Sequence, residues 1–218
     1  MAALMLGCGR AVTTAEWRNM AARSGSVAHE IPATPARSDV DPLVKGLTDG
    51  HLVVHGSDAD LAAIVLRLLR TNRLELPVGY VPVDPRSPVA RLWKLPSDTV
   101  AAALDGQPDT MPLVRDDAGG VLIGLGVLEP ARGTVYVDDQ IPLRGATARV
   151  AVTPDPELGL RVRVVRKGLL RNKTSSLAGR AVQFGGEPVA PVRDGVAHPR
   201  SLNRWTWYRH TEDLRIVR

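Results

Sequence analysis

Cysteine is almost absent from this 218-residue chain, which contains only Cys8. A single cysteine can form neither an internal disulfide nor a thiolate zinc site, so we expect a cytoplasmic setting. The chain also lacks an apolar run long enough to cross a bilayer. Its first ten residues are too short for a secretory signal, and Arg10 lies on the wrong side of the apolar stretch.

Aromatic residues make up only 4% of the chain, and they concentrate at 204–210. In a strand, alternation places Trp205 and Trp207 on one face and Tyr208 on the other. This pattern favours a tryptophan pair in the core of a β domain, and a base-stacking surface is the alternative. The histidines His55, His198 and His210 show no metal-ligand spacing, so we predict no metal site.

The remaining sequence predicts an α/β half followed by a β half. Residues 1–39 contain a short helix around 15–22 but no clear strand, 40–109 resemble an α/β domain, and 110–218 a β-rich domain. Strand-like runs occur at 121–127, 134–137, 148–152, 160–165, 180–184 and 204–210. A last strand is expected at 214–217.

The most informative segment is the change from strand to helix after residue 55. Residues 51–55 form an apolar run of strand length, and from Asp60 onward apolar residues recur at helical spacing. A strand–turn–helix junction directs free N–H groups and a helix dipole toward one point, which suits an anion. The simpler interpretation is that Ser57 or Asp58 only caps the helix.

Four segments together resemble the diacylglycerol kinase, sphingosine kinase and NAD kinase family. Residues 56–62, Gly-Ser-Asp-Ala-Asp-Leu-Ala, correspond to the family's Gly-Gly-Asp-Gly-Thr-Leu-Asn turn. Residues 81–91, Val-Pro-Val-Asp-Pro-Arg-Ser-Pro-Val-Ala-Arg, correspond to its Ile-Pro-Leu-Gly-Thr-Gly-Asn-Asp-Phe-Ala-Arg loop. Asp-Gly-Gln at 105–107 and Asp-Gly-Val at 194–196 match an Asp-Gly-Lys-like turn and Asp-Gly-Glu. The resemblance runs from about residue 40 to the C-terminus.

This resemblance implies a fold and a set of site residues. The fold would be NAD kinase/diacylglycerol kinase-like, with an N-terminal α/β domain, a β-rich C-terminal domain and a cleft between them. The last strand, at 214–217, would return to the first domain as the family's C-terminus does. The nucleotide would meet residues of the two loops, with ATP and Mg²⁺ as the implied cofactors; these residues are Gly56, Ser57, Asp58, Asp60, Arg86 and Ser87. Asp194 would be the catalytic base, and Asp58 would lie near magnesium.

The departures from the family pattern weaken the kinase interpretation. Ser57 and Ala59 narrow a loop in which the family has glycine, and Pro85 and Pro88 remove N–H donors from the second loop. Asp60 adds negative charge near the expected phosphate, unless a metal or Arg86 lies between them. At 194–196 valine replaces the metal-network glutamate, and Asp-Gly is also a common tight turn.

The formal net charge is +5, and cations are dense between 161 and 180. The loop after residue 165 would present cations to an anionic membrane, namely Arg166, Lys167, Arg171 and Lys173. A solvated loop is the alternative. Nucleic acid is disfavoured because the charge is modest and aromatic residues are not interleaved.

Three functions follow from this sequence. The leading one is a diacylglycerol kinase-like protein with degenerate phosphate loops that binds a nucleotide or a phosphorylated lipid, with weak or no kinase activity. The second is an active ATP-dependent lipid kinase. The third is a basic β-domain adaptor for anionic membrane or RNA.

Overall fold

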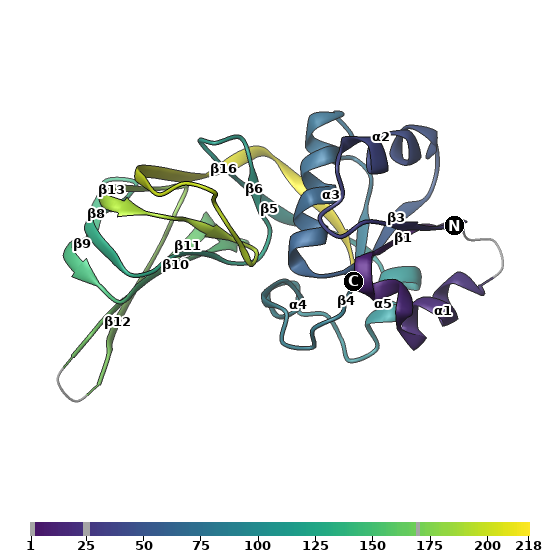
Figure 1. Ribbon diagram of the computed structural model, residues 1–218, viewed down its shortest axis with the longest axis horizontal. Coiled ribbons are helices and arrows are strands. Elements are labelled where there is room, and N and C mark those ends of the chain that lie inside the picture. Colours follow the sequence, from purple (N-terminus) through teal and green to yellow (C-terminus); the bar gives the residue numbers. More distant parts are fainter. Residues whose placement is uncertain (1–2, 24–26, 169–170) are drawn as a thin grey trace. The chain divides into compact units, whose positions relative to one another are not determined.

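The structure is a computed structural model that describes residues 3–23, 27–168 and 171–218. The chain divides into two compact units (Figure 1). Unit 1 comprises Met1–Met111 and Asp213–Arg218, and unit 2 comprises Pro112–Glu212. Strands β5 (Pro108–Asp116) and β16 (Leu202–Val217) each begin in one unit and end in the other.

Unit 1 is built on a parallel sheet with the strand order β2-β1-β3-β4, followed by the end of β16. The strands are β1 (Ala3–Cys8), β2 (Val27–Ile31), β3 (His51–Gly56) and β4 (Val78–Pro82). The chain moves from β1 to one side for β2 and then to the other side for β3. The strand order therefore reverses between β1 and β3, which makes this position the topological switch point of the sheet.

Helical segments connect these strands. They are η1 (Gly9–Thr13), α1 (Ala15–Ala21), α2 (Arg37–Gly46), α3 (Asp58–Arg70), α4 (Pro88–Leu92) and α5 (Thr99–Asp105). Every residue of β1 and β3 is buried, as expected for parallel strands covered on both faces. The predicted strand at 51–55, the helix from Asp60 and the short helix at 15–22 are confirmed.

The sequence analysis was wrong about strands in the N-terminal segment. Residues 1–39, in which no clear strand was expected, supply β1 and β2, and β1 pairs with both β2 and β3. The β1 sequence, Ala-Leu-Met-Leu-Gly-Cys, has no β-branched residue, so its composition does not favour a strand over a helix. The pairing of this segment with β2 on one side and β3 on the other therefore determines that it forms a strand.

The regular secondary structure of the described part of unit 2 consists of strands. The part of β16 in this unit continues the order β16-β13-β8-β9, and a second sheet has the order β12-β11-β10-β7-β14-β15. These strands are β6 (Val121–Leu122), β7 (Gly126–Leu128), β8 (Ala131–Val137), β9 (Gln140–Thr147), β10 (Arg149–Asp155), β11 (Gly159–Arg166), β12 (Lys173–Gly179), β13 (Ala181–Val189), β14 (Val192–Arg193) and β15 (Val196–Ala197). Trp205 and Trp207 lie in the core, as predicted.

Two predicted strands differ from the observed ones. The run at 121–127 is interrupted, because β6 ends at Leu122 and β7 begins at Gly126. The backbone N–H groups of the intervening residues bind the Asp194 carboxylate instead of a neighbouring strand. The runs at 204–210 and 214–217 belong to one strand, β16, and its end pairs with β4 through Ile216 and Val78.

Candidate functional site

The candidate site in unit 1 lies at the carboxyl edge of the parallel sheet, at the switch point between β1 and β3. Gly56 ends β3, and Ser57 is the N-cap of α3. The Ser57 side chain accepts a hydrogen bond from the Asp60 backbone nitrogen at 3.2 Å. The capping function that the sequence suggested for Ser57 is therefore confirmed.

Asp60 completes this cap and connects two loops. Its carboxylate accepts hydrogen bonds from the Ser57 backbone nitrogen at 2.8 Å and from the Ser57 hydroxyl at 2.7 Å. It also accepts one from the Thr34 backbone nitrogen at 2.6 Å, in the loop after β2. The residue is 5% exposed, and a Cβ added at Gly56 would lie 2.8 Å from its Oδ2 and 3.1 Å from the Cys8 Cβ. A protein carboxylate thus lies over the ends of β1 and β3.

Asp58 connects the first candidate loop, residues 56–62, to the second candidate loop, residues 81–91. Its Oδ1 accepts hydrogen bonds from the Ser87 hydroxyl at 2.5 Å and the Tyr80 hydroxyl at 2.8 Å. Its Oδ2 lies 3.3 Å from the Val89 backbone nitrogen. Burial, and then the charge of Asp58, raise the pKa of Tyr80, so the phenol stays protonated and can donate. The structure thus brings together Asp58 and Ser87, two of the residues selected from the sequence.

Ser87 and Arg86 are adjacent in sequence but differ in environment. Ser87 is buried and caps α4, accepting a hydrogen bond from the Ala90 backbone nitrogen at 2.9 Å. The Arg86 side chain is 90% exposed, and its Nε lies 3.7 Å from Asp84 Oδ1. The Asp60 carboxylate accepts its hydrogen bonds from Ser57 and Thr34, so its charge is balanced by these donors and not by Arg86.

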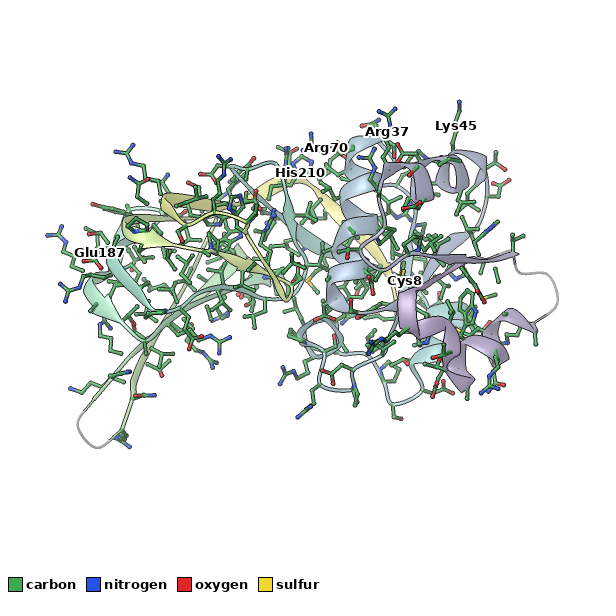
Figure 2. The ribbon with its side chains drawn as sticks, viewed as in Figure 1. Cys8, Arg37, Lys45, Arg70, Glu187 and His210 are labelled. Carbon is green, nitrogen blue, oxygen red and sulfur yellow. The ribbon has the colours of Figure 1, made fainter. Side chains whose placement is uncertain are left out.

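Residues outside the predicted set also contribute to this edge. Cys8, labelled in Figure 2, ends β1, and its Cβ lies 3.1 Å from where a Cβ on Gly56 would be. Burial raises the pKa of its thiol. His55 is 2% exposed, with Nδ1 2.8 Å from the Val81 carbonyl oxygen and Nε2 2.8 Å from the Thr14 hydroxyl. The only sequence signal for Cys8 and Thr14 is the apolar run at 3–8 followed by a Gly-rich turn, which would have placed both at the end of a strand.

Asp194, the candidate base, lies in unit 2 and is buried in a turn. Its Oδ1 accepts hydrogen bonds from the backbone nitrogens of Gly124 at 2.7 Å and Leu125 at 2.9 Å, and its Oδ2 accepts one from Ile123 at 2.9 Å. Asp194 and Gly195 both have positive φ, at 47° and 88°. These values are typical of the tight hairpin turn between β14 and β15.

The four candidate cations of the anionic-surface site belong to the β11–β12 hairpin of unit 2. Arg166 donates to the Pro142 carbonyl and lies 3.4 Å from the Ser175 hydroxyl, so its guanidinium is held against the sheet. Lys167, Arg171 and Lys173 are exposed. The neighbouring β11 alternates as predicted, with Leu160, Val162 and Val164 buried and Arg161 and Arg163 exposed.

Within the described ranges, no group of three or more His, Cys, Asp or Glu side chains is arranged to hold a metal ion. In the same part of the chain, no helix has the length and apolar character needed to cross a bilayer.

Comparison with known proteins identifies the fold. No protein-family model and no curated protein matches the sequence. Among solved structures, one described as "A putative diacylglycerol kinase from Bacillus anthracis str. Sterne" matches with a TM-score of 0.67 and 9% identity, covering 98% of this chain and 96% of the other. An NAD kinase from Archaeoglobus fulgidus in complex with ATP matches with a TM-score of 0.58 and 14% identity, covering 100% of this chain and 94% of the other. The chain therefore has a diacylglycerol kinase and NAD kinase-like fold, which combines an α/β unit with a β-rich unit.

Proposed function

We propose that the protein binds a nucleotide at the carboxyl edge of the unit 1 sheet and transfers phosphate to lipids weakly or not at all. The observation that carries this proposal is the Asp58–Ser87 hydrogen bond, which holds the two candidate loops together beside the switch point. Open parallel sheets bind ligands at this position. The first turn of α3 also lies there, and its free N–H groups favour a phosphate.

The fold and one carboxylate oxygen of Asp58 favour ATP, together with magnesium, as the nucleotide. The Archaeoglobus fulgidus NAD kinase was solved with ATP, which makes ATP the first ligand to test. Among the described residues, the hydrogen bond that Asp58 Oδ2 accepts is long, 3.3 Å from the Val89 nitrogen, which makes this oxygen the candidate ligand for a cation. Mg²⁺ is commonly held by one or two carboxylates together with substrate phosphates, so Asp58 fits a magnesium–nucleotide complex.

Weak turnover is supported by the first loop. The Ser57 N–H, a donor that a phosphate would use, already binds the Asp60 carboxylate. That carboxylate places a negative charge where a second negative group would have to bind. Ala59 and the two loop prolines, Pro85 and Pro88, further reduce the close approach and the N–H donors on which the family relies. These departures make the phosphate loops degenerate, and we therefore expect only a modest affinity for the nucleotide.

The environment of Asp194 also supports weak turnover. A general base needs a free oxygen within reach of the hydroxyl that it deprotonates. Both Asp194 oxygens accept backbone hydrogen bonds, and the residue is 5% exposed. The second candidate function, an active lipid kinase with Asp194 as base, requires this turn to open.

A contact with anionic membrane is a further candidate for unit 2, and a specific observation favours it. Lys167 and Arg171 follow the end of β11 and Lys173 begins β12; all three are exposed, and none has an ion-pair partner among the described residues. Free cations near an anionic bilayer each contribute about 1 kcal/mol of attraction. The ligand in this case is the lipid headgroup and not RNA, because exposed aromatic residues do not accompany the cations.

The test of nucleotide binding is a thermal-shift titration of the full chain with ATP, ADP and NAD, with and without magnesium. A ligand that binds only the folded state raises the melting temperature by mass action. We expect ATP with magnesium to give the largest shift, and Asp58→Asn to reduce it. Asp39→Asn, on the exposed start of α2, is the matched control and should leave it unchanged.

A phosphorylated lipid analogue forms a separate arm of the titration. Stabilisation by this analogue alone would identify the ligand as a phosphorylated lipid and would overturn the nucleotide proposal. The absence of any shift, confirmed by calorimetry at millimolar ligand, would overturn both. Transfer of labelled phosphate from ATP to diacylglycerol micelles measures turnover separately.

A further inference from the structure

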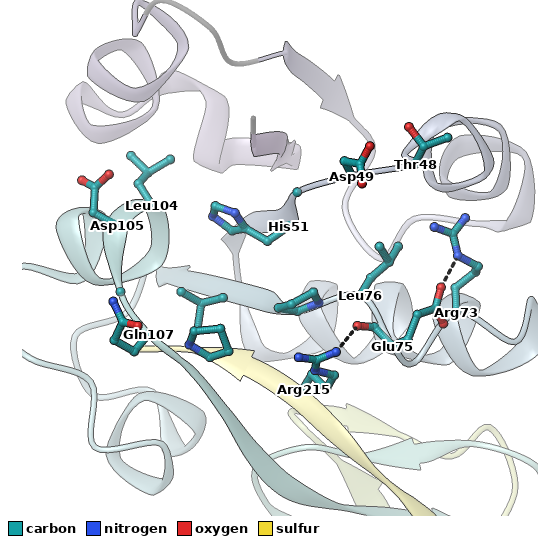
Figure 3. A pocket seen from close by; sticks show the side chains of 15 residues that line it. Thr48, Asp49, His51, Arg73, Glu75, Leu76, Leu104, Asp105, Gln107 and Arg215 are labelled. Atoms are coloured by element: carbon teal, nitrogen blue, oxygen red, sulfur yellow. Dashed lines mark hydrogen bonds and ion pairs between the residues drawn. The ribbon is translucent and has the colours of Figure 1, made fainter. Parts of the chain in front are cut away.

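Unit 1 contains a cavity at the edge of the sheet opposite to the candidate site. It lies where β3 begins at His51 and where Pro77 precedes β4, and it has a volume of about 570 Å³ (Figure 3). This is the size of a small-molecule pocket. Leu76, Leu104 and Val217 supply apolar walls, and every lining residue belongs to unit 1.

His51 provides a hydrogen-bond acceptor on the wall of this cavity. The residue is 5% exposed, and its Nε2 lies 2.9 Å from the Ala103 carbonyl oxygen. A carbonyl can only accept, so Nε2 carries the hydrogen and the neutral ring keeps a lone pair on Nδ1. Burial lowers the pKa of His51, which favours this neutral form. Among the described residues no partner is found for Nδ1.

Among the described residues, two of the carboxylates that line the cavity lack a strong ion-pair partner. Asp49 has no ion-pair partner within the part of the chain that the structure describes, and Asp105 meets only the half-exposed Arg23 at 3.3 Å. Arg73 is already committed, because it binds Glu75 at 2.6 Å and two backbone carbonyls. The remaining cation, Arg215, is exposed and lies 3.4 Å from the Glu75 carbonyl oxygen.

We propose that this cavity binds a small organic cation, an alkylammonium or alkylguanidinium. Its N–H groups would donate to Nδ1 of His51, a residue that lines the cavity, and its charge would be balanced by Asp49 and Asp105. Its alkyl part would pack against Leu76, Leu104 and Val217. A neutral or anionic molecule of the same shape lacks either the donors or the charge and is rejected.

Four isosteric probes of the full-length protein test this chemistry: n-butylammonium, n-butylguanidinium, n-butanol and butyrate. Binding is followed by the ring nitrogen resonances of His51 in NMR titrations, assigned with His51→Gln. We expect saturable shifts with the two cations only. Asp49→Asn and Asp105→Asn should each weaken binding about fivefold, as for a partly exposed charge pair. Glu16→Gln, an exposed carboxylate on α1, is the matched control and should change nothing.

The other outcomes overturn the proposal. Equal or tighter binding of butyrate would mean that Arg215 and not the carboxylates selects the ligand. Equal binding of butanol would show an apolar pocket without charge selection. Saturable cation binding that both Asp variants leave intact would place the cation elsewhere, and no saturable shift with any probe would remove the site.

Discussion

The carboxylate of Asp60 lies 2.6 Å from the backbone nitrogen of Thr34, so the loop after β2 is tied to the first turn of α3. The same carboxylate binds the Ser57 N–H and sits against Gly56. This carboxylate lies at the switch point, where open parallel sheets bind their ligands. It therefore places a negative charge of the protein at the position that an anionic ligand would occupy. We therefore expect the same residue to stabilise the protein and to oppose the proposed phosphate binding.

Replacing Asp60 should separate these two effects. Asp60→Asn removes the charge and leaves one of three donors without an acceptor, so we expect a loss of about 1–2 kcal/mol in the free energy of unfolding. The affinity for ATP should rise, because the repulsion between two anions is gone. Urea denaturation and calorimetry measure the two quantities. Asp39→Asn removes a comparable cap on α2, where Asp39 binds the Ala36 nitrogen at 2.8 Å, and should affect stability only. A lower ATP affinity in Asp60→Asn would contradict this account.

The connection between the two loops can be measured as a coupling energy. Asp58→Ala and Ser87→Ala both break the same hydrogen bond, so their effects on the free energy of unfolding should fall short of additivity by about 0.5–3 kcal/mol. The matched pair is Ser87→Ala with Asp98→Asn, because Asp98 caps α5 through the Ala101 nitrogen and shares no partner with Ser87. Additive effects for the Asp58 pair would mean that the loops are held by other contacts.

Local patterns predicted the strand–turn–helix at 51–70 and the buried tryptophan pair, because periodicity reports which side of an element is buried. The pattern could not reveal the contact of Asp60 with Thr34, which lies 26 residues away in sequence. It missed β1 for a similar reason, since that strand is defined by partners at Val27–Ile31 and His51–Gly56. The pattern identified Asp194 as a candidate residue, but it could not predict the three backbone N–H groups that bind the Asp194 carboxylate. These groups belong to residues about 70 positions earlier in the sequence.

Asp194 should prove to be a structural residue of unit 2. In Asp194→Asn the amide keeps one acceptor oxygen for three backbone donors, so we expect a loss of about 1–3 kcal/mol and a lower melting temperature. Asp138→Asn is the matched control, because Asp138 also binds backbone nitrogens in a positive-φ turn but is exposed. Robust lipid phosphorylation by the wild type that Asp194→Asn abolishes, at unchanged melting temperature, would favour the active-kinase function.

The hairpin cations should bind anionic vesicles in a salt-dependent way. A variant with Lys167, Arg171 and Lys173 changed to serine loses three charges, each contributing about 1 kcal/mol near an anionic bilayer. Co-sedimentation with phosphatidylserine vesicles should therefore fall at low salt and differ little from wild type at high salt. The control changes three other exposed arginines of unit 2, Arg132, Arg144 and Arg204, to serine. Equal loss in both variants would indicate a general charge effect and not a membrane-facing hairpin.

Acidification should destabilise the protein through His51. Burial lowers the pKa of this side chain below its ordinary value of 6.5, and the Ala103 carbonyl and Asp105 oppose that shift only in part. Below pH 6.5 the unfolded chain takes up a proton that the folded chain still excludes. The stability is thus fully present above 6.5 and is lost as the pH falls through the lowered folded pKa.

The measurement is the free energy of unfolding at a series of pH values on both sides of 6.5. His51→Gln cannot be protonated, so its free energy of unfolding should fall less on acidification than that of the wild type. His210 contributes in the same direction, because burial and then Arg115 lower its pKa, and His210→Gln reports that share separately. An identical pH dependence of His51→Gln and the wild type would show that the buried imidazole is not linked to stability.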